Sequence, residues 1–425
     1  MQFKAEVFQN QFLPQGAREV HAIMTVSAEG SGAISSASNT GQNLFGIICD
    51  VSGSMDGNKI QAAKNAIVQL INLLPEHVFF FIVTGSNRAT LTVSLTKASA
   101  ENKQRAIAAV RKIQVGGTTA ISTWLAAALE QFKQMPNALR QALLLTDGQN
   151  DRQDEQFLNQ VILASEGVFQ CDCRGVGTDW QVNQLQKISS KLLGTTDIIP
   201  NPDAIEADFR QILDKAMSKS ISDVAMRIWT PQGGKVLFCK QVSPEIADIS
   251  DRARAVKAQV VEYPTGAWAK AESRDYHFCI EVNAGNVGDE MLAGRASLIY
   301  TVDGVENKVA EARILAIWTD DDAKSTKIDR RVAHYTGQAE LAQSIQEGLE
   351  ARARGDIEAA TVKLGKAVKL AYNSGNEATA KLLRTVVDIE DAPTGTVKLK
   401  REVAKEDAMA LETRSTKTTR IPKDR

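Results

Sequence analysis

The sequence predicts an α/β protein in which a doubly wound, mostly parallel sheet is joined to an antiparallel β-sandwich and a C-terminal helical hairpin. Between residues 43 and 219, apolar strand-like runs alternate with amphipathic helix-like segments, which is typical of a parallel sheet covered by helices on both faces. Residues 222–320 show short strand-like segments separated by turn residues. Leucines and small residues then recur at helical spacing over residues 328–390.

Length and composition limit the class of protein. A chain of 425 residues exceeds what one core usually supports, so we expect several domains. The hydrophobic content of 43%, the charged content of 24% and the net charge of −1 fit a globular protein, with neither nucleic acid nor a membrane as partner. The sequence shows no signal peptide and no apolar run near the roughly 20 residues of a membrane span. We therefore expect a cytoplasmic protein.

The cysteines and histidines give no recognisable metal motif. The five cysteines form no CxxC pair, so we expect buried, reduced thiols. The four histidines are widely scattered along the chain, which argues against a zinc site.

The N-terminal segment precedes the α/β region. Residues 1–28 alternate apolar and polar side chains, as one or two strands would, with a turn at Pro14–Gly16. They have no evident partner in the parallel sheet, so we expect them to complete the β-sandwich, with the α/β domain of residues 43–219 inserted between its halves. Residues 29–42 are small and polar and are expected to form a linker.

Within residues 43–219, the expected strands are continuous apolar runs, because a parallel sheet is buried on both faces. The expected helices bury a stripe of residues three and four apart. The main strands are expected at residues 45–50, 78–84, 139–146 and 168–176, with a shorter one at 195–199, and the helices at 59–74, 101–113, 121–135, 155–166, 181–193 and 202–219.

The C-terminal third changes character again. Residues 328–390 resemble a tetratricopeptide-like hairpin, which must cover its apolar faces by packing on another domain or a partner. Residues 391–425 are charged and rich in Ser and Thr, and we expect a partly disordered tail. A kinase could modify its hydroxyls for a forkhead-associated (FHA) domain to read; the alternative is a plain solvated tail.

Polar side chains follow the apolar strand that ends at Asp50. Asp50, Ser52 and Ser54 stand at alternate positions of the motif DVSGSM, so their oxygens can converge above the end of the strand. Such oxygens suit a hard divalent cation such as Mg²⁺, with Mn²⁺ or Ca²⁺ as substitutes. Ligands of open α/β sheets bind at this edge.

Two further pieces follow at the ends of other predicted strands or in their loops: Gly116-Gly117-Thr118-Thr119 and Thr146-Asp147-Gly148. With DVSGSM, they resemble the von Willebrand factor type A (vWA) family and its metal-ion-dependent adhesion site. The resemblance covers residues 43–219 and implies a Rossmann-like core. It also implies that Ser52, Ser54 and a threonine bind the metal directly, while Asp50 and Asp147 hold metal-bound waters or bind more loosely.

The resemblance leaves the threonine open between two neighbours. In the family pattern, an apolar residue stands two positions after the ligand threonine and a leucine six positions after it. Thr119 fits, with Ile121 and Leu125, and Thr118 is the second choice.

Two other interpretations of DVSGSM compete with a metal site. One is an Asp/Ser-capped helix start after a buried strand. The other is an aspartyl-phosphate enzyme with Asp50 as nucleophile, although position 52 then lacks the second carboxylate.

The motif RGVGTDW follows another predicted strand of the sheet. Thr178 and Asp179 are expected at the same edge as the metal, where they could form part of a partner-binding rim. The alternative is that one of them caps the next helix while Trp180 packs in the core.

The layout of the whole chain resembles bacterial cytoplasmic vWA proteins of actinobacteria and cyanobacteria. The resembling stretches include VFQNQFLPQGAREVHAI, SRDYHFC, WTDDDAKST, VAHYTGQAELAQ and ETRSTKTTR. Such proteins tend to accompany Ser/Thr kinases, phosphatases and FHA-domain proteins. The resemblance implies a non-enzymatic scaffold in signalling or stress response, which captures an Asp or Glu of a protein partner at its metal. The alternatives are a regulatory subunit that docks on an ATPase or Ser/Thr kinase, and a phosphotransfer enzyme using Asp50.

Overall fold

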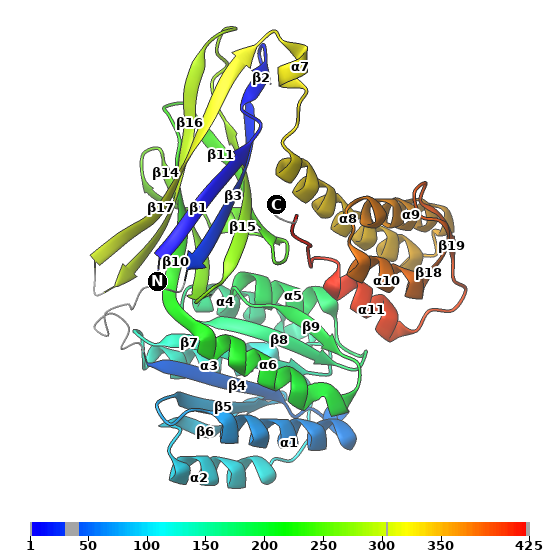
Figure 1. Cartoon of the computed structure of the whole chain (residues 1–425). Helices are drawn as coiled ribbons and strands as arrows, with labels where there is room; N and C mark the ends of the chain where they lie inside the picture. Colours follow the sequence, from blue (N-terminus) through cyan, green and yellow to red (C-terminus); the bar gives the residue numbers. More distant parts are fainter. Residues whose placement is uncertain (1, 30–41, 303–304, 422–425) are drawn as a thin grey trace. The chain divides into compact units, whose positions relative to one another are not determined.

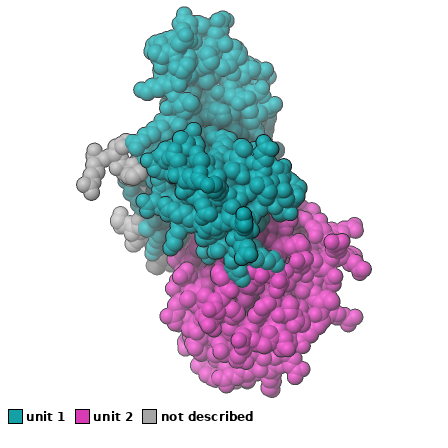
Figure 2. All heavy atoms as spheres, turned by 90° about the vertical axis from the view of Figure 1, so that its right-hand side faces the viewer, with its two compact units in different colours: residues 1–38, 222–425 teal, residues 39–221 magenta. Residues whose placement is uncertain are grey.

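The computed structural model describes residues 2–29, 42–302 and 305–421 (Figure 1). Most of the expected linker, residues 30–41, lies outside these ranges, as do residues 303–304, where the sequence Asp-Gly indicates one of the turns expected within residues 222–320. The chain forms two compact units, coloured separately in Figure 2: residues 39–221, here the α/β unit, and residues 1–38 with 222–425, here the β-helical unit. Within the described ranges, no helix has both the length and the apolar character that crossing a membrane requires.

The α/β unit is built on one six-stranded sheet with the order β6-β5-β4-β7-β8-β9. Its neighbours pair in parallel except for β5 and β6, which are antiparallel, so the predicted doubly wound, mostly parallel sheet is confirmed. The strands are β4 (Asn43–Asp50), β5 (Phe79–Gly85), β6 (Ala89–Lys97), β7 (Leu139–Thr146), β8 (Gln170–Val176) and β9 (Thr196–Ile199).

Helices cover both faces of this sheet (Figure 1). Alternate residues of each strand point to opposite sides, and because both sets are apolar, both faces must be buried. Phe45 and Ile47 of β4 join one core with α1, α2 and α6, whereas on the other face Phe81 of β5 meets Phe132 of α3. The helices are α1 (Asn58–Leu73), α2 (Ala100–Arg111), α3 (Ile121–Lys133), α4 (Glu155–Ser165), α5 (Val182–Lys191) and α6 (Ile205–Ser218).

The sheet order creates a switch point beside β4. From β4 the chain proceeds to β5 and β6 on one side, and it later returns to β7 and β8 on the other side. The loops that follow β4 and β7 therefore diverge at the carboxyl edge, which is where open α/β sheets bind ligands.

The β-helical unit contains the predicted antiparallel sandwich as two sheets, β1-β3-β15-β11-β12 and β13-β14-β10-β16-β17-β2. The N-terminal strands pair within these sheets: β3 lies between β1 and β15, and β2 runs parallel to the end of β17. The strands are β1 (Gln2–Gln9), β2 (Phe12–Pro14), β3 (Glu19–Glu29), β10 (Lys219–Trp229), β11 (Lys235–Ser243), β12 (Ala247–Asp248), β13 (Arg254–Lys257), β14 (Val260–Ala269), β15 (Ser273–Glu281), β16 (Glu290–Val302) and β17 (Val305–Thr319).

The helical part of this unit extends beyond the predicted hairpin. Helices α8 and α9 pack closely at Gly348, where an added Cβ would lie 2.7 Å from the Leu364 side chain. They share a core with α10, with α11 and with a two-stranded hairpin. The elements are α7 (Asp322–Ser325), α8 (Arg330–Ala353), α9 (Ile357–Asn373), α10 (Glu377–Val386), β18 (Val387–Asp391), β19 (Thr396–Leu399) and α11 (Lys405–Arg414).

Two expectations for the C-terminal region are therefore wrong. Residues 387–390 were expected at the end of the helical region, but they lie in strand β18, which pairs with β19. Residues 391–421 were expected to be a partly disordered tail, but they complete this hairpin and form α11. Leu411 of α11 is fully buried among the helices, which supplies the apolar contact that the charged sequence does not suggest.

Candidate metal centre

The carboxyl edge of β4 and β7 brings together two of the predicted pieces. The parallel register places Cys49 of β4 beside Leu145 of β7. The next residues, Asp50 and Thr146-Asp147, therefore leave the sheet side by side. Both carboxylates are fully buried at this edge.

The Gly-Gly-Thr loop is the third piece, and it is bonded to the turn after β4. Gly53 N donates to Gly117 O (3.1 Å), and Gly116 N donates to Val51 O (2.8 Å). Gly117 has a φ of 84°, a left-handed conformation that glycine adopts without strain. These bonds hold the loop over the end of β4.

Asp50 is held rigidly by its neighbours. One carboxylate oxygen accepts from Ser52 N (2.7 Å), and the other accepts from the Thr146 hydroxyl (2.5 Å). Burial raises the pKa of the Asp50 carboxyl above its ordinary value; hydrogen bonds from Ser52 and Thr146 oppose this, and the charge of Asp147 adds to it. Two carboxylates at one buried edge favour a positive charge between them.

Ser52 and Ser54 lie in the turn after Asp50, and their hydroxyl oxygens are 3.0 Å apart. The Ser54 hydroxyl also donates to Asp147 Oδ1 (2.7 Å). Ser52 is buried, whereas Ser54 is exposed. The turn thus aims both hydroxyls at the Asp147 side of the site.

Thr119, rather than Thr118, contributes to the cluster. Thr119 is 6% exposed and Thr118 lies on the surface. A Cβ built on Gly148 would lie 3.1 Å from Thr119 Oγ1, 3.3 Å from Ser54 Oγ and 3.9 Å from Asp50 Oδ2. Oxygens from the β4 turn and from the Gly-Gly-Thr loop therefore surround one point above Gly148, which belongs to the third piece.

Lys59 was missed in the sequence, although it stands only four residues after DVSGSM, on the first turn of α1. Its ammonium lies 2.5 Å from Asp147 Oδ2 and 3.9 Å from Asp179, and it donates to Ser54 O at 3.5 Å. Within the described residues, this chain of contacts brings Asp179 to the site but leaves Thr178 out. Asp179 is two-thirds exposed, so it lies at the rim.

The alternative interpretation of RGVGTDW is half right. Trp180 packs in the core, against Gly175, where an added Cβ would lie only 1.9 Å from its indole ring. The N-cap residue of α5 is Gln181, and its side chain accepts no capping hydrogen bond from the first turn. Neither Thr178 nor Asp179 therefore caps this helix.

The residues fit a hard divalent cation. The donor set is entirely oxygen: it consists of the hydroxyls of Ser52, Ser54 and Thr119 and the carboxylates of Asp50 and Asp147. The space above Gly148, which a Cβ would fill, is bordered by three of these oxygens at similar distances. Oxygen ligands in such a set are what Mg²⁺ and Ca²⁺ prefer.

Comparisons with known proteins match parts of both units. Family models match residues 46–198 as a von Willebrand factor type A domain and residues 369–415 as a von Willebrand factor type A C-terminal domain. A von Willebrand factor type A structure from Catenulispora acidiphila is 43% identical, covers 99% of this chain and 97% of that chain, and superposes with a TM-score of 0.92. The ArnB paralog VWA2 from Sulfolobus acidocaldarius shares the fold (TM-score 0.61) at 14% identity, over 98% of both chains.

Curated relatives match a smaller part of the chain. An uncharacterized protein of Synechocystis is 25% identical over 209 residues, which are 48% of this chain and 49% of that protein. Human inter-alpha-trypsin inhibitor heavy chain H4 is 30% identical over 153 residues, which are 33% of this chain and 16% of that protein. The matches thus span half or less of these relatives.

The relative from Catenulispora carries the family assignment, because the similarity extends over nearly the full length of both chains. Taken with the two matched domains, it shows that this chain belongs to the von Willebrand factor type A family.

Proposed function

We propose that this chain is a non-enzymatic protein-interaction subunit that captures a carboxylate of a protein partner through Mg²⁺ held by Asp50, Ser52, Ser54, Thr119 and Asp147. Domains of this family generally mediate protein–protein interaction at such a site and often hold a divalent metal. The observation that carries the proposal is the set of oxygens from Asp50, Ser54 and Thr119 around one point above Gly148, where all three sequence pieces meet.

The charges around this point favour an anionic partner. Asp50 and Asp147 together carry two negative charges, and Lys59 carries one positive charge. A divalent cation turns the local sum from −1 to +1, and it supplies an electrophilic position that a carboxylate can fill. The neutral hydroxyls of Ser52, Ser54 and Thr119 leave most of this positive charge available to the partner.

Each residue then has a separate task. Asp50 orders the turn through Ser52 N and is itself fixed by Thr146. Asp147 orients Ser54, and Lys59 balances its charge. Because both oxygens of Asp50 accept hydrogen bonds in a buried setting, this carboxylate is poorly placed to act as a nucleophile, which favours binding over phosphotransfer.

We further propose that the interaction takes place in the cytoplasm. All five cysteines are free and buried, as expected in a reducing compartment.

The first test measures Mg²⁺ binding by calorimetry with a matched pair of variants. Thr119→Ala removes a hydroxyl from the cluster, and Gly148→Ala places a methyl group among the oxygens. We expect each to weaken Mg²⁺ binding about 10–100-fold, which corresponds to about 1.5–3 kcal/mol for a lost contact to a charged group. Thr118→Ala, on the neighbouring surface residue, should bind as wild type does.

The second part of the test is capture of partners from native lysate in Mg²⁺ and in EDTA. We expect proteins that are retained only in Mg²⁺, by wild type and by Thr118→Ala but not by Thr119→Ala. Equal retention by all three proteins in EDTA would overturn the proposal and move the interaction surface away from this edge.

A further inference from the structure

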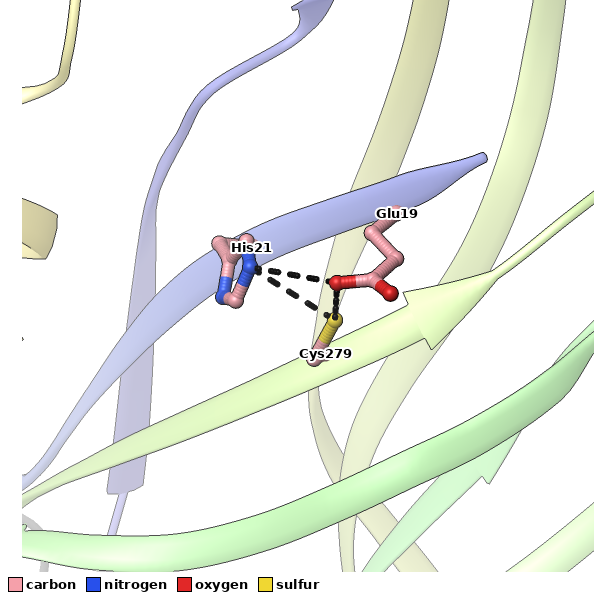
Figure 3. Close-up of side chains that lie close together, drawn as sticks. All are labelled: Glu19, His21 and Cys279. Carbon is pink, nitrogen blue, oxygen red and sulfur yellow. Dashed lines mark hydrogen bonds and ion pairs between the residues drawn. The ribbon is translucent and has the colours of Figure 1, made fainter. Parts of the chain in front are cut away.

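A second cluster of metal-binding groups lies in the β-helical unit, on one face of the sheet β1-β3-β15-β11-β12. Glu19 and His21 are two residues apart on β3, so their side chains lie on the same face. The antiparallel register pairs His21 directly with Cys279 of β15. Figure 3 shows the three side chains turned toward one another. A carboxylate, an imidazole and a thiol therefore meet at one place.

The three donor atoms form a nearly regular triangle. Cys279 Sγ lies 3.8 Å from His21 Nε2 and 4.0 Å from Glu19 Oε2, and the last two atoms are 3.9 Å apart. Zinc bonds of about 2.0–2.3 Å at tetrahedral angles place donors about 3.3–3.6 Å apart. Small side-chain rotations that move the donor atoms by a few tenths of an ångström would bring their separations into this range.

A neighbouring histidine can orient the imidazole. His21 Nδ1 lies 3.2 Å from His277 Nε2, and the Phe238 ring packs edge-on against His277. His277 Nε2 can accept a hydrogen bond from the Nδ1–H group of His21, and this tautomer leaves Nε2 of His21 free to bind a metal.

The geometry differs from that of a catalytic cysteine. In a Cys–His–carboxylate triad, the thiol and the carboxylate contact opposite nitrogens of the ring. Here both approach Nε2, which is the pattern of a shared ligand. Cys279 is also fully buried. A thiolate at this position needs a cation beside it.

We propose that Glu19, His21 and Cys279 bind a borderline-soft transition-metal ion, Zn²⁺ by preference, at a site separate from the oxygen site of the α/β unit. Three protein ligands leave a fourth position for water or an external ligand. The side chains of Glu19 and His21 are 61% and 35% exposed, so an ion can enter from solvent.

A metal ion at this site would cross-link two strands that are distant in the sequence. His21 and Cys279 are 258 residues apart in sequence, and the whole α/β unit lies between them. Closing a loop of this length costs conformational entropy, which a metal bond between β3 and β15 offsets.

The test is a Co²⁺ titration of the full chain, because Co²⁺ reports a thiolate ligand through a charge-transfer band in the near ultraviolet. The proposed donors of the oxygen site include no thiol, and Cys49, which precedes Asp50, lies in the core of the sheet, so this site should not produce the band. We expect the band to appear with one equivalent of Co²⁺ and to disappear when Zn²⁺ is added. Cys279→Ser and His21→Gln should abolish it, and Glu19→Gln should weaken Co²⁺ binding about tenfold or more.

Two matched variants serve as controls. Cys239→Ser removes another buried thiol of the same sheet, which pairs with Phe278 rather than with the cluster. Glu29→Gln alters a carboxylate on the same strand that pairs with Lys4. Both should keep the band.

A folded wild-type chain that gives no thiolate band would overturn the proposal, and so would a band that persists in Cys279→Ser. If Cys279→Ser does not fold, an unchanged titration of the more exposed Glu19→Gln and His21→Gln variants contradicts it equally.

Discussion

Asp172 is a buried carboxylate in the α/β unit, away from the metal centre, and it shows how single residues support the sheet. It accepts from Thr195 N (2.8 Å), from the Thr195 hydroxyl (2.6 Å) and from Gln141 Nε2 (2.8 Å). Burial by itself would raise the pKa of Asp172, but Lys215, Arg174 and the Thr195 bonds outweigh it. The pKa is held below the ordinary value.

This depressed pKa predicts an acid dependence of stability. The unfolded chain binds the Asp172 proton more readily than the folded chain, so the stabilisation is complete above the unfolded pKa of about 3.9 and is lost as the pH falls below it. We expect Asp172→Asn to lower the free energy of unfolding by about 1–3 kcal/mol at pH 7, because it removes a buried charged acceptor of three hydrogen bonds and its attraction to Arg174 and Lys215. Urea unfolding should show this cost shrinking below about pH 4. A cost that is constant from pH 7 to pH 3 would contradict the prediction.

The residue scale also shows what sequence reasoning can find. Thr119 was preferred over Thr118 from the resemblance to the family, and the structure places Thr119, and not Thr118, among the oxygens around Gly148. Lys59 was missed because a lysine in the first turn of a helix resembles any exposed lysine until its contact with Asp147 is seen. His21 and Cys279 were missed for a different reason. Scattered histidines argue against zinc only if the fold does not bring them to a cysteine, and the pairing of β3 with β15 does so.

At the scale of elements, the alternation of strands and helices in residues 43–219 was predictable, because burial on both faces leaves a clear apolar pattern. The elements after residue 386 could not be predicted in the same way. Helix α11 has mostly charged and small residues, and its few buried side chains, such as Leu411, find their contacts on helices distant in sequence. The matched C-terminal domain, residues 369–415, covers this same region.

The segment after α11, residues 416–419, forms hydrogen bonds with the sandwich and with α8. Ile246 N donates to Thr416 O (2.8 Å), Thr418 N donates to Pro244 O (3.0 Å), and Thr419 N donates to Gln338 Oε1 (2.8 Å). The Thr418 hydroxyl donates to Val242 O (2.7 Å), a bond that a phosphate at this position could not make. Phosphorylation of Thr418 therefore requires the segment to detach first.

These bonds predict the effect of truncation. Removing residues 416–425 should lower the free energy of unfolding of the β-helical unit by about 1–3 kcal/mol, since a few hydrogen bonds of about 1 kcal/mol each are partly offset by the entropy of ordering the segment. Hydrogen exchange resolves the effect by region. We expect faster exchange in β11 and α8 and unchanged exchange in β4 and β7, and equal exchange in β11 with and without the segment would show that these hydrogen bonds contribute nothing.

At the scale of the whole molecule, each unit has its own core and its own candidate metal site. The candidate site of the α/β unit presents oxygen ligands, whereas that of the β-helical unit presents sulfur, nitrogen and oxygen. Hard Mg²⁺ discriminates strongly between such sets, and Zn²⁺ prefers the second. Because a ligand stabilises only the structure that binds it, the two ions should act on different parts of the chain.

Hydrogen exchange in the presence of each ion measures this division. At 100 times its dissociation constant, an ion adds about 2.7 kcal/mol, or roughly 100-fold slower exchange for amides that open with the unit that binds it. Mg²⁺ should slow exchange in β4 and β7 and leave β3 and β15 unchanged, and Thr119→Ala should remove this effect. Zn²⁺ should slow exchange in β3 and β15, and His21→Gln should remove that protection while any Zn²⁺ effect in the α/β unit persists. Protection of β3 and β15 by Mg²⁺, or Zn²⁺ protection there that survives His21→Gln, would mean that the two sites do not have the separate chemistries that their ligands indicate.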